Sequence, residues 1–130
     1  MIVDTSAIIA ILKHESDSAK YAAALAKRIP KLMSAATFVE ASIVVDSQWD
    51  PILSRRFDDL LALSQIQVES VTPSQAVLAR AAYRDFGKGS GHPAKLNFGD
   101  CFSYALAKES GQKLLFKGND FSETDLESAI

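Results

Sequence analysis

Residues 1–12, MIVDTSAIIAIL, begin as a short apolar run, reach an aspartate, and continue as a second apolar segment with helical character. The first apolar pair, residues 2–3, predicts a short buried strand, and either Asp4 or Thr5 is suited to cap the helix that follows. A buried strand that leads directly into a helix is typical of α/β folds. Ligands in open α/β sheets bind at the carboxyl ends of the strands, which is where Asp4 is expected.

The rest of the chain repeats this alternation of strands and helices. Further strands are expected at residues 31–34, 66–71 and 113–116, and further helices at residues 18–28, 35–48, 51–64, 73 onwards and 98–109. Strands separated by helices predict a mostly parallel sheet with right-handed crossovers. We therefore predict one α/β domain over residues 1–130, with a four- to five-stranded sheet and helices on both faces.

Composition narrows the class of protein. The 130 residues suit one domain, and 48% hydrophobic and 23% charged residues are ordinary for a globular protein. A net charge of −2 argues against a general nucleic-acid coat protein. The single cysteine, Cys101, cannot form an internal disulfide and is expected to be a small buried side chain. With neither a signal peptide nor a membrane-length apolar run, we expect a cytoplasmic protein without membrane contact.

Four acidic residues each follow an apolar run: Asp4, Glu40, Asp100 and Asp120. Each alone is explained by a helix cap or a turn, and Glu40 in particular by a capping box over residues 37–40. Together they are expected at one edge of a parallel sheet. Clustered carboxylates need a cation, and oxygen ligands favour Mg²⁺, with Mn²⁺ as the alternative. The set predicts metal-assisted hydrolysis of phosphodiesters.

Several segments resemble PIN-domain proteins, and more narrowly the VapC toxins of type II toxin–antitoxin systems. They are IVDTSA at residues 2–7, Glu40, NFGDCFSYALA at residues 97–107 and LLFKGNDF at residues 114–121. The resemblance covers the whole chain and implies a PIN fold. It also implies a metal-dependent endoribonuclease that forms a homodimer and is neutralised by a cognate VapB-type antitoxin.

The resemblance also implies roles for individual residues. Asp4 and Asp100 would be the main metal ligands, and Glu40 would complete the metal site. Ser6, together with Thr5, would support the substrate or the attacking water.

The chain departs from the family pattern at one position. Many members carry an acidic residue where this chain has Gly118. Either Asp120 replaces that acid as a fourth catalytic carboxylate, or the site uses three acids.

Basic residues near the glycine-rich loop at residues 87–93 are candidates for holding RNA phosphates. The substrate-binding candidates are Thr5, Ser6, Lys88, Lys95 and Lys117. An ordinary solvated loop is the alternative interpretation of the basic residues.

Two other functions are compatible with the residues. The first is a phosphatase that forms an aspartyl-phosphate on Asp4, although such enzymes usually need a second aspartate where Ser6 stands. The second is a non-catalytic binding module, in which the acids cap helices and the apolar helix at residues 35–48 contacts a partner.

Overall fold

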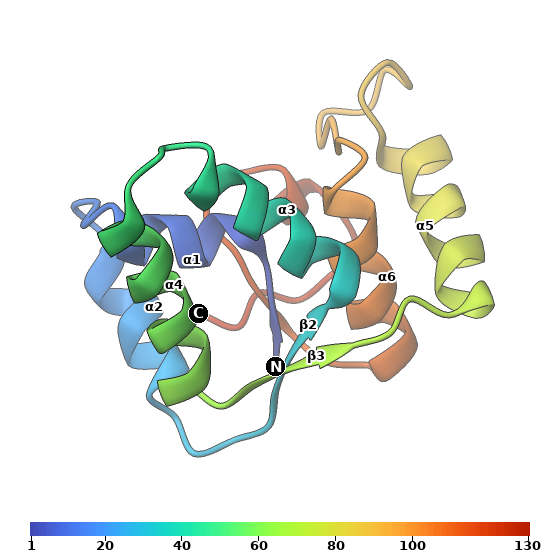
Figure 1. Cartoon of the computed structure of the whole chain (residues 1–130). Helices are drawn as coiled ribbons and strands as arrows, with labels where there is room; N and C mark the ends of the chain where they lie inside the picture. Colours follow the sequence, from blue (N-terminus) through green and yellow to red (C-terminus); the bar gives the residue numbers. More distant parts are fainter.

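The apolar pair at the start of the chain forms β1 (Ile2–Val3), an inner strand of a four-stranded parallel sheet (Figure 1). This computed structural model describes all 130 residues. The sheet order is β3-β2-β1-β4, with β2 at Lys31–Ser34, β3 at Ile66–Glu69 and β4 at Leu114–Leu115. The predicted parallel α/β sheet is therefore confirmed, with four strands.

Helices cover both faces of the sheet. They are α1 (Thr5–Leu12), α2 (Ser18–Leu25), α3 (Ala35–Asp46), α4 (Pro51–Leu63), α5 (Pro73–Phe86) and α6 (Asp100–Ser110), followed by the short 3₁₀ helix η1 (Phe121–Glu123). Successive strand side chains point to opposite faces of a sheet. Accordingly, Val3 and Leu115 belong to the core formed with α1 to α4, whereas Ile2 and Leu114 belong to the core formed with α5 and α6. β1 and β4 thus each contribute to two separate apolar layers.

Side-chain caps fix where most helices begin. Asp4 caps α1, Ser34 caps α3, Asp50 caps α4 and Thr72 caps α5. A proline occupies the first position of α4 and of α5, where a missing N–H does no harm.

Helix α6 begins two residues later than expected. It starts at Asp100 because Asn97 and Asp100 cap each other: the Asp100 N–H donates to Asn97 Oδ1 and the Asn97 N–H donates to Asp100 Oδ2, both at 2.9 Å. Phe98 therefore lies before the helix and is 77% exposed, so its predicted place in the apolar stripe is wrong.

Cys101 packs as a small apolar side chain. It is buried, and burial, helped by the charge of Asp100, raises the pKa of its thiol to about 11.

The N-terminus is held at the opposite end of the sheet. The ammonium group of Met1 donates to the Pro30 carbonyl at 3.0 Å and to the Gln112 side chain. None of the helices has the length and hydrophobicity needed to cross a bilayer.

Candidate metal centre

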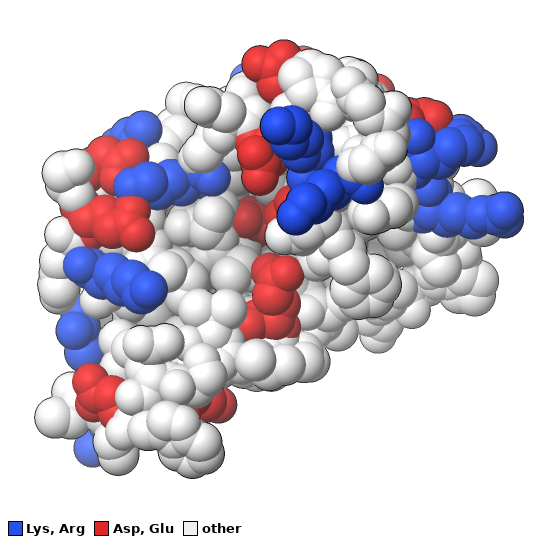
Figure 2. Space-filling view, turned by 90° about the horizontal axis from the view of Figure 1, so that it is seen from above, with Lys and Arg blue, Asp and Glu red and all other residues white.

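The carboxyl ends of the strands face one side of the molecule. Asp4 directly follows β1, α3 directly follows β2, and Lys117 lies just past β4. Figure 2 looks onto this side and shows acidic side chains in a row across its middle, with lysine and arginine side chains beside the row. The topology thus brings acids from distant parts of the chain to one edge of the sheet.

Asp4 is the most buried of the four acids, with 3% of its surface exposed. Its Oδ2 accepts from the Ser6 backbone N–H at 2.9 Å and from Ser6 Oγ at 2.6 Å. Its Oδ1 accepts from Ser103 Oγ at 2.6 Å. No lysine or arginine forms an ion pair with it. A buried carboxylate without a cationic partner is costly, and hydroxyl donors offset only part of that cost.

Glu40 reaches the same edge from the second turn of α3. Its Oε1 accepts from Thr5 Oγ1 at 2.6 Å. Burial, followed by the charge of Asp4, raises the Glu40 pKa, and the Thr5 hydrogen bond opposes this rise. The capping-box interpretation of residues 37–40 is wrong, because Ser34 caps α3 through the Ala36 N–H and Glu40 lies beyond the first turn.

Asp100 opens α6 and faces the other acids. Burial raises its pKa to about 7, and the charges of Asp4, Glu40 and Asp120 act in the same direction, while the hydrogen bond from Asn97 opposes them. Charges affect the pKa of Asp100 in this way only when they lie near it, so the four carboxylates lie in the same part of the molecule. The four acids singled out in the sequence therefore form one electrostatic group, with Asp120 at its exposed rim.

The four carboxylates do not converge on a single point. No three Asp, Glu, His or Cys side chains lie close enough together to hold a metal ion as they are placed. Asp4, Glu40 and Asp100 instead accept hydrogen bonds from different donors, and like charges repel one another. The donor set nevertheless suits a hard divalent cation, because every side chain offers oxygen and the buried Asp4 has no other positive partner.

Sequence reasoning missed two residues of this region. Thr37 and Ser103 are both fully buried, and their hydroxyls lie 3.0 Å apart. Ser103 is three residues after Asp100 in α6, so the two side chains share a helical face. Ser103 lies outside the apolar stripe expected for that helix at residues 98, 101, 102, 105 and 106, so no local signal in the sequence pointed to it.

The predicted substrate-binding lysines fall into two groups. Lys88 and Lys95 are exposed and form no ion pair. Their loop is anchored, because the Lys88 N–H donates to the Leu96 carbonyl at 2.8 Å.

Lys117 differs. Its ammonium donates to Glu15 and, at 2.7 Å, to Asp17, and these partners raise its pKa. The side chain of Lys117 is therefore engaged elsewhere. Its backbone N–H instead donates to Ser6 Oγ at 3.0 Å, which ties β4 to the hydroxyl that holds Asp4.

The backbone accounts for the departure at Gly118. This residue has a φ of +102°, a conformation that side chains of L-residues rarely adopt. An acidic residue at this position would be strained in the observed turn. Asp120, two residues later, carries a charge that contributes to raising the pKa of Asp100.

Residues 1–127 match the PIN domain family, and the chain therefore belongs to that family. Across its whole length it is 58% identical to ribonuclease VapC28 of Mycobacterium tuberculosis, covering 98% of that protein. It is 49% identical over 129 residues to ribonuclease VapC42 of the same organism, covering 99% of this chain and 98% of the relative. Among PIN domains, its sequence thus groups with the VapC ribonucleases.

Solved structures support the same fold. The M. tuberculosis toxin VapC20, described as cleaving the sarcin-ricin loop, superposes with a TM-score of 0.71 at 18% identity, covering 96% of this chain and 95% of that one. A toxin–antitoxin complex from Klebsiella pneumoniae gives a TM-score of 0.68 at 18% identity, covering 93% and 89%. At this identity the two structures establish the shared fold and nothing further.

Proposed function

We propose that the protein is a metal-dependent endoribonuclease toxin that hydrolyses RNA phosphodiester bonds. Its sequence similarity to VapC ribonucleases supports the reaction class. The observation that carries the metal dependence is the buried Asp4 carboxylate, which has no cationic partner and lies within range of two further acids with raised pKa values. A bound cation would offset this accumulated negative charge.

Asp4, Glu40 and Asp100 are the residues that would hold Mg²⁺, or Mn²⁺ in its place. When bound, the ion lowers the pKa of a water molecule and polarises the scissile phosphoryl group. Ser6 keeps Asp4 in place through two hydrogen bonds, and Thr5 does the same for Glu40 through one. Asp120 adds negative charge at the rim, and we assign it a supporting catalytic role.

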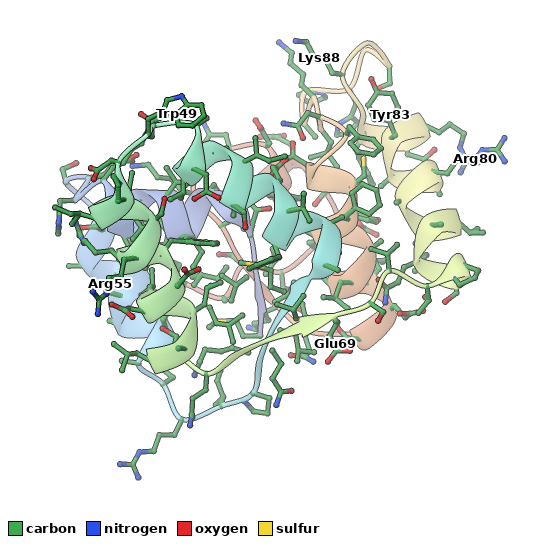
Figure 3. The ribbon with its side chains drawn as sticks, viewed as in Figure 1. Trp49, Arg55, Glu69, Arg80, Tyr83 and Lys88 are labelled. Carbon is green, nitrogen blue, oxygen red and sulfur yellow. The ribbon has the colours of Figure 1, made fainter.

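Lys88 and Lys95 complete the proposed substrate site. Both lie on the loop between α5 and α6, and Figure 3 shows Lys88 projecting from the outer end of that loop. Cations set beside a row of carboxylates can hold RNA phosphates that the acids alone would repel.

The decisive experiment is cleavage of cellular RNA in Mg²⁺, in Mn²⁺ and in chelator, by the wild type and by Asp4→Asn and Asp100→Asn variants. We expect cleavage in either metal and its loss in chelator and in both variants. Asp58→Asn is the matched control, since Asp58 is an exposed α4 residue outside the acidic group. Cleavage that persists in chelator and in both variants would refute the metal site.

The geometry disfavours the aspartyl-phosphatase alternative. Ser6 occupies the position where such an enzyme needs its second aspartate, and its hydroxyl is committed to Asp4 Oδ2. No second carboxylate is therefore available beside Asp4 at this position.

We also propose that a VapB-type antitoxin neutralises the protein by binding over α3 and the start of α4. Exposed apolar side chains gather there: Val39 (52%), Ile43 (62%), Trp49 (90%) and Ile52 (73%). Because α3 also carries Glu40, a partner on this surface would cover the edge of the acidic group. One of the structural neighbours is a toxin–antitoxin complex, which supports this kind of partner.

A second apolar surface is the proposed homodimer contact. It comprises Val77 and Tyr83 on α5 together with Phe98 before α6, which are 69%, 45% and 77% exposed. Sedimentation of the free protein tests this: we expect a dimer that Phe98→Ser weakens. The proposed compartment is the cytoplasm, where cellular RNA is found and where Cys101 needs no oxidising environment.

A further inference from the structure

The two oxygens of the Asp4 carboxylate are not equivalent. Oδ2 accepts two hydrogen bonds, both from Ser6, whereas Oδ1 accepts only one, from Ser103. An ionised carboxylate oxygen accepts about two such interactions. Oδ2 is therefore saturated, and Oδ1 keeps one position for a further ligand.

The hydroxyl chain that reaches Oδ1 has a fixed direction. An ionised carboxylate only accepts hydrogen bonds, so the Ser103 O–H must donate to Asp4. Ser103 then has no proton left for Thr37, and the Thr37 O–H must donate to Ser103 Oγ across 3.0 Å. Both residues are fully buried, so bulk water does not compete for these hydrogen bonds.

We propose that Ser103 and Thr37 are positioning residues that hold Asp4 Oδ1 with its remaining lone pair toward the metal. This inference rests on the proposed metal-dependent function. Asp100 and Ser103 share a face of α6, so one helix supplies a metal-binding acid and also the hydroxyl that orients the second acid. Outer hydrogen-bond partners of this kind fix the orientation of a ligand and raise metal affinity.

The test measures metal binding without RNA, by Mn²⁺ titration in a calorimeter and by the Mn²⁺ paramagnetic resonance signal. Ser103→Ala is expected to weaken Mn²⁺ binding by about 10–100-fold, the usual effect of losing an outer partner. Ser110→Ala is the matched control, because its hydroxyl lies in the same helix and bonds only to helix carbonyls. It should leave the affinity unchanged.

The Thr37 pair of variants separates positioning from packing. Thr37→Val removes the outer hydroxyl and keeps the volume, whereas Thr37→Ser keeps the hydroxyl and loses a methyl group. We expect Thr37→Val to weaken Mn²⁺ binding, by less than Ser103→Ala does, and Thr37→Ser to retain wild-type affinity. A merely structural role would give the reverse order or no difference.

Two failures have different meanings. If the wild type binds no Mn²⁺, the proposed metal-dependent function falls and this inference falls with it. If the wild type binds Mn²⁺ and Ser103→Ala binds it equally well, only the positioning role is refuted. Should Ser103→Ala not fold, equal affinity of Thr37→Val and Thr37→Ser would refute the role.

Discussion

The backbone of Gly99 lies directly against the carboxylate of Glu40. A Cβ placed on Gly99 would come within 1.6 Å of Glu40 Oε2. Gly99 immediately precedes Asp100, so two of the acids approach each other at a point where the chain has no side chain. The backbone of Gly99 is otherwise ordinary, with a φ of −63°. Its requirement for glycine is therefore one of space for the carboxylate.

We predict that Gly99→Ala lowers metal affinity and RNA cleavage while leaving the stability of the fold nearly unchanged. The added methyl group meets the end of a flexible side chain, so Glu40 can rotate away and the fold should remain close to wild-type stability. The displaced carboxylate should lower both Mn²⁺ affinity and RNA cleavage by an order of magnitude or more, about the scale of disturbing a metal ligand. Calorimetry and cleavage assays on one preparation measure both effects.

A double-mutant cycle provides the control for this prediction. In a Glu40→Ala background the methyl group meets no carboxylate, so Gly99→Ala should then leave Mn²⁺ affinity and thermal stability unchanged. An equal loss in both backgrounds would mean that Gly99 acts through something other than Glu40.

The raised pKa of Asp100 predicts a pH-dependent stability in the metal-free protein. An acid with a pKa of about 7 when folded and an ordinary value of 3.8 when unfolded binds its proton more tightly in the folded state. Its contribution is fully present below the lower value and is lost as pH rises through the higher one. Thermal unfolding in chelator should therefore show stability falling between these two pH values.

Asp100→Asn should flatten this pH dependence. Part of the slope should remain, because Glu40 also has a raised pKa. Added Mg²⁺ should stabilise the wild type most at the upper end of the range, where the carboxylates are ionised. A metal-free protein whose stability rises with pH over this interval would contradict the assignment.

Lys88 and Lys95, which are exposed and form no ion pair, predict salt-dependent RNA binding. Replacing Lys88 and Lys95 together with alanine should weaken RNA binding by inactive Asp4→Asn protein. It should also reduce the dependence of log affinity on log salt by about 0.7 for each RNA phosphate that the protein no longer neutralises. Lys117→Ala is the informative contrast, because that ammonium is bound to Glu15 and Asp17 and should not change the slope. Filter binding across a salt series measures all three proteins.

The exposed Trp49 predicts the antitoxin contact. Figure 3 shows it on the loop beyond α3, and 90% of its surface is accessible. Trp49→Ser should leave RNA cleavage and folding intact while weakening inhibition by the cognate antitoxin at least tenfold, about the effect of losing an aromatic anchor. Leu63→Ser is a suitable control, since Leu63 is 85% exposed at the far end of α4. Inhibition curves at fixed toxin concentration distinguish the two variants.

Periodicity and acid spacing predicted most of the fold because the strands are short, buried and followed at once by helices. The acids could be grouped because parallel strands end at one edge. What escaped prediction depends on contacts between distant segments. Trp49 and Phe57 are both large aromatic residues, whose type favours the core, yet Trp49 is 90% exposed and Phe57 is 2% exposed. Only the folded chain shows which of the two faces inward.

The site was predicted less completely for the same reason. Lys117 was predicted to bind phosphate because it follows a strand. Its ammonium group instead pairs with Glu15 and Asp17, about a hundred residues earlier in the chain. Thr37 and Ser103, 66 residues apart, meet only through packing of α3 against α6. Neither pairing leaves a local signal in the sequence.

The buried start of the chain has a practical consequence for anyone who prepares this protein. The ammonium group of Met1 rests on the Pro30 carbonyl, and Asp4 follows after only a two-residue strand. An affinity tag joined at this end would replace that charged group with a peptide bond and pull on the strand that carries the aspartate. Ile130, at the opposite terminus, is 47% exposed and offers the safer point of attachment.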